Sequence, residues 1–161
     1  MSVTTQPYEE ILSNLGTNIP ARPGVLIASD DDNDAKRLKT ILSEAGYGVE
    51  CARSITAACG AAKSGQFQVV ISKPQLRDGS WRRLTELANH YDLHFVVVVW
   101  AHTFDLREWA ETLDSGAFDV LDAVYDLPRV VEVVKGASWA AFLMGAAPIP
   151  QAIVSDSDKV A

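Results

Sequence analysis

Three consecutive carboxylates, Asp30, Asp31 and Asp32, follow Ser29 shortly after the apolar run 25–27. Carboxylate oxygens are ligands that hard divalent cations such as Mg²⁺ prefer, with waters completing the coordination. The same acids also favour the positive N-terminal end of a following helix, where they can cap free backbone N–H groups. The segment therefore predicts either a magnesium-binding loop or a helix cap, and both interpretations stay open on these residues alone.

The other chemically capable side chains form no recognisable catalytic group. His90, His94 and His102 have neither metal-ligand spacing nor a nucleophile beside them, so we expect surface or helix-end roles for them. Cys51 and Cys59 match no metal or redox motif and fall in apolar stretches, which predicts buried free thiols in a reducing compartment. The sequence also lacks a glycine-rich phosphate loop. We therefore expect no enzyme activity, no cofactor and no resident metal.

Short apolar runs alternate with helical patterns through the middle of the chain. The runs predict strands at 25–27, 49–52, 69–72, 95–99 and 118–121. Apolar residues at helical spacing follow each run, as Leu38, Ile41 and Leu42 follow the first. Glycines such as Gly46 and Gly116 are typical helix stops. The chain is thus expected to consist of five successive strand–helix units.

Strands that are apolar throughout, rather than alternating, are typical of a parallel sheet covered by helices on both faces. The predicted class is α/β, a doubly wound five-stranded parallel sheet of the flavodoxin-like (βα)5 type. In such open sheets the functional site lies beyond the carboxyl ends of the strands. The residues that decide function are then those directly after each strand, namely Ser29 to Asp32, Lys73, Trp100 to His102, and Asp122 with Ala123.

We expect one folded domain at 23–143, between an N-terminal extension and linker at 1–22 and a flexible C-terminal tail at 144–161. Prolines at 20 and 23 would stop a helix, and the tail combines prolines with serine and aspartate. No signal peptide pattern is present, and the apolar runs are shorter than a membrane span requires, which predicts a cytoplasmic protein away from membranes. The formal charge of −7 disfavours binding to nucleic acid.

The order of these motifs resembles the receiver domain of two-component response regulators. The resemblance rests on Val25-Leu-Ile-Ala-Ser-Asp-Asp-Asp, the Leu76-Arg-Asp-Gly turn and Gly116-Ala-Phe-Asp-Val-Leu, and it covers about residues 23 to 143. It implies a strand order of 2-1-3-4-5. In that family an aspartate at the end of the third strand accepts a phosphoryl group beside a Mg²⁺ held by an acidic pair, and a hydroxyl residue and a lysine contact the phosphoryl oxygens.

Several of these positions carry other residues in this chain. The position of the acidic pair falls on Ser29 and Asp30, and Asp31 follows as a further acid. The acceptor position falls on Lys73, the hydroxyl position on Trp100 and the lysine position on Ala123. The proline that follows the lysine in the family is replaced by Val124, and the aromatic switch position by Val120. An amine cannot form the acyl phosphate, and alanine cannot clamp it with a charge. The resemblance therefore implies a degenerate acceptor pocket. A one-residue shift would instead place Ser72 at the acceptor position, where a serine without an adjacent base is a weak nucleophile.

Two packing hypotheses follow from the replacements. Lys73, partly shielded from water, needs a charge partner, and an ion pair with Asp30 would fix the domain in one state. Trp100 is expected to fill the space left by Ala123 and Val124. A cation supplied by the chain itself would then stand where a metal and a phosphoryl group otherwise meet.

The sequence favours a phosphorylation-independent receiver that acts by binding a protein partner, either another signalling protein or a second copy of itself. Apolar residues near the end of the last helix suggest a contact surface, and our interface candidates are Tyr125, Trp139, Phe142 and Leu143. The same segment could instead fold over the core or over a short amphipathic helix predicted from Tyr8 to Leu15 in the N-terminal extension. The alternatives for function are a phosphorylatable or Mg²⁺-binding receiver of a phosphorelay, and a small-molecule-binding protein on the same fold.

Overall fold

The computed structural model describes residues 23–102 and 105–145. The predicted domain 23–143 lies almost wholly within these ranges, while the predicted extension 1–22 and most of the tail 144–161 lie outside them. Within the described residues, no helix is long and apolar enough to cross a membrane.

Five parallel strands form the central sheet in the order β2-β1-β3-β6-β7. They are β1 (Gly24–Ala28), β2 (Gly48–Ala52), β3 (Val69–Ser72), β6 (Val96–Ala101) and β7 (Asp119–Asp122). Because β6 and β7 are the fourth and fifth strands of the sheet, this is the predicted order 2-1-3-4-5. The remaining two strands, β4 (Gln75–Leu76) and β5 (Gly79–Ser80), form a separate small hairpin around the predicted Arg77-Asp78-Gly79 turn.

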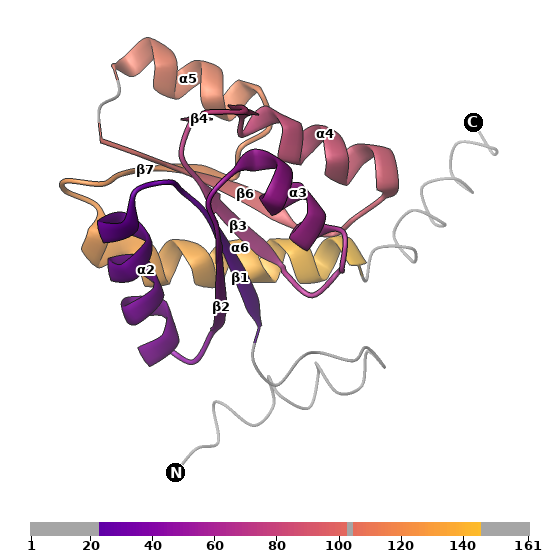
Figure 1. Ribbon diagram of the computed structural model, residues 1–161, viewed down its shortest axis with the longest axis horizontal. Helices are drawn as coiled ribbons and strands as arrows, with labels where there is room; N and C mark the ends of the chain where they lie inside the picture. Colours follow the sequence, from indigo (N-terminus) through magenta and orange to yellow (C-terminus); the bar gives the residue numbers. More distant parts are fainter. Residues whose placement is uncertain (1–22, 103–104, 146–161) are drawn as a thin grey trace, which may run out of the picture.

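Helices cover both faces of the sheet (Figure 1). They are α2 (Asp32–Glu44), α3 (Ile55–Ala62), α4 (Arg82–Tyr91), α5 (Leu106–Asp114), and α6 (Val130–Gly145), which follows the 3-10 turn η1 (Leu127–Arg129). Figure 1 shows α4 and α5 along one side of the sheet and α2 and α6 along the other. The doubly wound α/β prediction is thus confirmed, with α6 ending two residues beyond the predicted domain boundary.

Successive strand residues point to opposite faces, so each strand feeds two separate cores. On β6, Val97 and Val99 pack with residues of α3 and α4, whereas Val98 and Trp100 pack with residues of α2 and α6. All of β1 and β3 is buried. This two-sided burial explains why the strands are apolar throughout, and it holds their carboxyl ends at one rigid edge.

Side chains from neighbouring loops cap the helices that begin at this edge. Ser54 is the N-cap of α3, and its hydroxyl accepts a hydrogen bond from Ala57 N at 3.0 Å. The carboxylate of Asp78, from the β4–β5 turn, accepts two more from Ile55 N and Thr56 N at 2.9 and 2.8 Å. Hydrogen bonds to Thr56 and Ile55 hold the pKa of Asp78 at about 2, below its usual value. The hairpin is thereby tied to the start of α3.

Two sequence-based expectations about burial are wrong. Leu106, Trp109 and Leu113 have the helical spacing of the apolar residues that were expected to cover the sheet, yet all three are exposed, and the buried residue of α5 is Thr112. Cys51, on the edge strand β2, is exposed, whereas Cys59 is buried as predicted. Burial raises the pKa of both thiols, so neither has the lowered pKa of a reactive cysteine.

Candidate functional site

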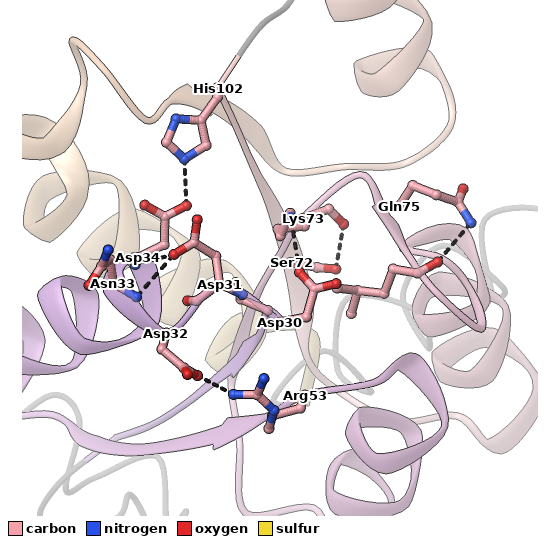
Figure 2. Close-up of polar contacts among 12 residues, drawn as sticks. Asp30, Asp31, Asp32, Asn33, Asp34, Arg53, Ser72, Lys73, Gln75 and His102 are labelled. Atoms are coloured by element: carbon pink, nitrogen blue, oxygen red, sulfur yellow. Dashed lines mark hydrogen bonds and ion pairs between the residues drawn. The ribbon is translucent and has the colours of Figure 1, made fainter.

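The carboxyl ends of β1 and β3 bring Asp30 and Lys73 together, as predicted. Backbone pairing sets Ala28 beside Ser72, and Lys73 N donates to Ala28 O at 3.1 Å. The next residues then project from the same edge, and Lys73 Nζ lies 2.8 Å from Asp30 Oδ1 (Figure 2). The Lys73 side chain is 28% exposed and that of Asp30 45% exposed. The pair is therefore open to water, and we expect it to contribute little net stability.

Lys73 alters the acidity of its partner. The hydrogen bond from the Lys73 ammonium, helped by its charge, lowers the pKa of Asp30 below the usual carboxyl value, against a smaller opposing effect of desolvation. The charged form of Asp30 is thus stabilised by a cation that belongs to the chain. A metal ion at Asp30 would have to displace that ammonium.

The other residues after β1 hold the loop and cap α2. Ser29 is buried, and its hydroxyl accepts a hydrogen bond from Asp31 N at 3.1 Å. Asp31 is the N-cap of α2, where its Oδ1 accepts from Asn33 N and Asp34 N. Asp32 forms an exposed ion pair with Arg53. The structure thus assigns Asp31 to the helix-cap interpretation, while Asp30 remains directed toward Lys73.

Ser72, the alternative acceptor, is fully buried. Its hydroxyl donates to the carbonyl oxygen of Lys73 at 2.8 Å. Because the oxygen is shielded from solvent and its proton is directed to the backbone, Ser72 offers no accessible nucleophile in this arrangement.

Trp100 lies in the core on the α2 and α6 side of the sheet. Its side chain is 1% exposed and belongs to the same buried cluster as Ala123, Leu121 and Val98. Its indole Nε1 has no hydrogen-bond partner within the described part of the chain. Ala123 is buried and its backbone N–H donates to Ala101 O, whereas Val124 is exposed. Trp100 thus occupies space beside Ala123, and the expectation that it also fills space left by Val124 is wrong because Val124 turns outward.

The site contains a contact that the sequence-based interpretation missed. His102 Nε2, after β6, lies 2.6 Å from Oδ2 of Asp34, whose side chain is 2% exposed (Figure 2). Asp34, Leu38 and Leu42 are the buried residues of α2, each four positions apart. This spacing places Asp34 on the inward face of the helix, so a carboxylate in the apolar stripe was the signal that could have revealed a polar partner.

The predicted interface residues lie at the β7 end of the sheet and along α6. Tyr125 is 79% exposed and Leu143 is also exposed. Trp139 and Phe142 are half-buried and meet edge to face, with 5.6 Å between ring centroids. Sequence reasoning missed that α5 adds exposed apolar side chains at the same end of the sheet.

Comparison with solved structures supplies an independent view of this arrangement. The signal receiver domain of a Vibrio parahaemolyticus protein superposes with a TM-score of 0.71 at 20% identity, over 79% of this chain and 98% of that domain. The chain has the receiver fold. A response regulator receiver domain from Clostridium thermocellum gives a TM-score of 0.67 at 20% identity, over 76% of this chain and 98% of that one. The Vibrio cholerae chemotaxis protein CheY4 gives a TM-score of 0.65 at 18% identity, over 73% of this chain and 99% of that one.

Sequence comparison adds no relative to these structural matches. No family model matches the chain, and no curated protein matches it. The receiver fold is thus retained at a level of identity too low to carry over the activity of any one of these proteins, and function has to be argued from the chain's own residues.

Proposed function

We propose that this receiver-like domain serves two-component type signalling without accepting a phosphoryl group, and that it acts by binding a protein partner in the cytoplasm. The ion pair between Lys73 and Asp30 carries the proposal. An amine at the carboxyl end of the central strand cannot form an acyl phosphate, and its charge replaces that of a divalent cation. On this proposal the chain is not an enzyme, and its net charge of −7 disfavours nucleic acid as the partner.

Neighbouring residues support the same proposal. Trp100 is packed in the core and offers no hydroxyl at the edge of the sheet, and Ala123 offers no ammonium group. Ser72, the nearest hydroxyl, is buried against the backbone. The acceptor, the hydroxyl and the lysine are therefore all replaced, and of the acidic pair only Asp30 remains, in contact with Lys73.

We predict that acetyl phosphate and Mg²⁺ leave the mass of the chain unchanged. Intact-mass spectrometry after incubation measures this directly, with a receiver domain that retains its acceptor aspartate as the positive control in the same buffer. The expected result is no gain for this chain while the control gains one phosphoryl group. A phosphorylated fraction that disappears in the Ser72→Ala variant would instead favour Ser72 as the phosphoryl acceptor. A phosphorylated fraction that persists in that variant would contradict the proposal that the acceptor pocket is degenerate.

The proposed partner surface is the β7 end of the sheet together with α5 and α6. We define this apolar edge by its exposed residues Leu106, Trp109, Leu113, Phe118, Val124 and Tyr125. The exposed Leu143 and Met144 lie at the end of α6, where Gly145 lies against His94. β7 is the last strand of the sheet, α5 packs against it, and the ring of Phe118 lies against Gly136 of α6. Large apolar side chains gathered at one edge are characteristic of a protein interface.

A second copy of the chain is the first partner to test. We expect sedimentation velocity to show a concentration-dependent dimer that the Trp109→Glu variant weakens at least tenfold, because a charge would be buried in the contact. Tyr91→Glu is the matched control, since Tyr91 is an exposed aromatic on α4, outside the apolar edge. Sedimentation as a monomer over the whole accessible concentration range would rule out self-association, and an equal effect of both variants would rule out the apolar edge.

A further inference from the structure

Asp34 carries a carboxylate into the interior of the domain with few groups to balance it. Its side chain is 2% exposed, and burying an ionised carboxylate is costly unless a cation or hydrogen-bond donors compensate. The charged or potentially charged groups near it are His102, at 2.6 Å from Oδ2, and Arg37, at 3.9 Å from Oδ1. Arg37 is half-exposed and too distant for a hydrogen bond. The close partner is therefore an imidazole, which is also a common metal ligand.

A second carboxylate lies beside this pair. Asp31 uses Oδ1 to cap α2, and within residues 23–102 and 105–145 its other carboxylate oxygen accepts no hydrogen bond. One ligand atom from each of Asp31, Asp34 and His102 lies within 4.8 Å of the other two. Figure 2 shows the His102 ring directed at Asp34, with Asp31 alongside. The three groups come from two elements, the start of α2 and the end of β6, so they converge through the fold and not through sequence proximity alone.

We propose that Asp31, Asp34 and His102 form a binding site for a first-row divalent transition metal, with Zn²⁺ as its best-matched ion. One imidazole nitrogen and two carboxylate oxygens are ligands that Zn²⁺ accepts, and water would occupy a fourth, open position. Coordination through Nε2 takes the place of the His102–Asp34 hydrogen bond, with the imidazole proton carried on Nδ1. The imidazole favours a transition metal over Mg²⁺, which prefers oxygen ligands alone.

The geometry requires only small adjustments. Zn–N and Zn–O bonds of about 2.0–2.2 Å in a tetrahedron separate neighbouring ligand atoms by roughly 3.3 Å. The His102–Asp34 contact then opens by less than about 1 Å, and no pair of ligand atoms has to close by more than about 1.5 Å. The His102 side chain is 50% exposed and can rotate without disturbing the core. Asp34 is fixed by the buried face of α2, so one ligand is held in place before the ion arrives.

This site is separate from the Lys73–Asp30 pair. It uses none of the atoms of that pair, and it does not depend on the proposed signalling function, because it would bind metal whether or not the chain accepts phosphate. A bound ion would fasten the start of α2 to the end of β6. It would also balance the charge of the buried Asp34 carboxylate.

Zinc titration of the untagged full chain, stripped of metal with a chelator, tests the proposal. Calorimetry is expected to show one Zn²⁺ per chain, and thermal melting a rise in Tm that Mg²⁺ at the same concentration does not produce. His102→Ala should weaken Zn²⁺ binding at least tenfold. Asp31→Ser should weaken it while its hydroxyl still caps α2. Both variants keep Asp34 itself, but His102→Ala removes its close partner, so circular dichroism has to show that this variant is folded before its affinity is compared. Asp31→Ser leaves the His102–Asp34 contact in place and tests the site independently.

Two matched controls separate this site from adventitious binding. His94→Ala removes an exposed histidine elsewhere on the surface, and Cys51→Ser removes the exposed thiol, so both should bind Zn²⁺ like the unmodified chain. Absence of saturable Zn²⁺ binding by the unmodified chain would overturn the proposal, and His102 would then be a hydrogen-bond partner of Asp34 only. Unchanged affinity in folded His102→Ala protein would overturn it equally.

Discussion

Trp100→Ala is expected to destabilise the domain by about 3–5 kcal/mol and to lower its Tm by roughly 10–20 °C. Trp100 and Trp81 are the two largest fully buried side chains. Trp100 sits on the fourth strand of the sheet with α2 and α6 packed over the same cluster. Ala123 beside it is too small to fill the space, and the rigid strands limit collapse around it. Truncation therefore removes buried apolar surface and leaves a cavity as well.

Thermal and urea unfolding, followed by circular dichroism, measure this loss. Trp109→Ala is the matched control, because Trp109 lies on the exposed face of α5 and its removal should change the free energy of unfolding by less than about 1 kcal/mol. Trp100→Phe should cost less than Trp100→Ala, since it keeps most of the volume and removes an indole N–H that has no partner in the described residues. If Trp100→Ala and Trp109→Ala unfolded at the same temperature, Trp100 could not be the packed residue described above.

Trp100 also limits how far a phosphoryl-binding site can be restored by mutation. A small hydroxyl at position 100 would recreate one part of a phosphoryl site only by opening a hole in the core. Replacing Trp100 by a small hydroxyl residue would therefore lower the stability of the domain as well as change its chemistry. Any attempt to recover phosphotransfer has to refill the space beside Ala123 as well.

Much of the fold could be predicted from the sequence because the strands are buried on both faces. Runs such as 69–72 are apolar throughout, and this pattern is diagnostic of a parallel sheet between two helical layers. Asp30 and Lys73 each follow a strand of the parallel sheet, so both were expected at the edge formed by the carboxyl ends of the strands. Their opposite charges made the contact between them predictable. These inferences needed only local pattern and the geometry shared by all doubly wound sheets.

Helix α5 shows where such reasoning fails. Leu106, Trp109 and Leu113 have the spacing of a buried face, but the helix presents that face to solvent and packs through Thr112. Periodicity reports that a helix has an apolar side and does not report which surface covers it. An apolar side left uncovered by the rest of the described domain is consistent with a partner covering it, which is why the misprediction bears on function.

The contact between His102 and Asp34 could not be derived from spacing, because 68 residues separate the two. Asp34 alone carried a signal, as a carboxylate at an inward position of α2. His102 carried none, since an isolated histidine after a strand is compatible with many roles. Only the pairing of strands β1, β3 and β6 brings the start of α2 and the end of β6 together.

Lys73→Asp is expected to convert the edge of the sheet from a Mg²⁺-insensitive to a Mg²⁺-dependent state. The substitution places a carboxylate beside Asp30, on a strand paired directly with β1. Two adjacent carboxylates repel each other without a cation, so the variant should melt below the unmodified chain in the absence of metal. Mg²⁺ accepts carboxylate oxygens and keeps its remaining waters, so it should bind between them and restore stability. At a tenfold excess over its dissociation constant, Mg²⁺ would contribute about 1.4 kcal/mol.

Melting curves at increasing MgCl2, with NaCl at matched ionic strength, test this conversion. Lys73→Met is the control that removes the ammonium without adding a ligand, and its Tm should not respond to Mg²⁺ beyond the effect of salt. The unmodified chain should not respond either, because its own ammonium already sits 2.8 Å from Asp30. A rise in Tm with Mg²⁺ for the unmodified chain, as large as that for Lys73→Asp, would mean that Lys73 does not take the place of the cation. The domain would then retain a Mg²⁺ site, contrary to the proposed function.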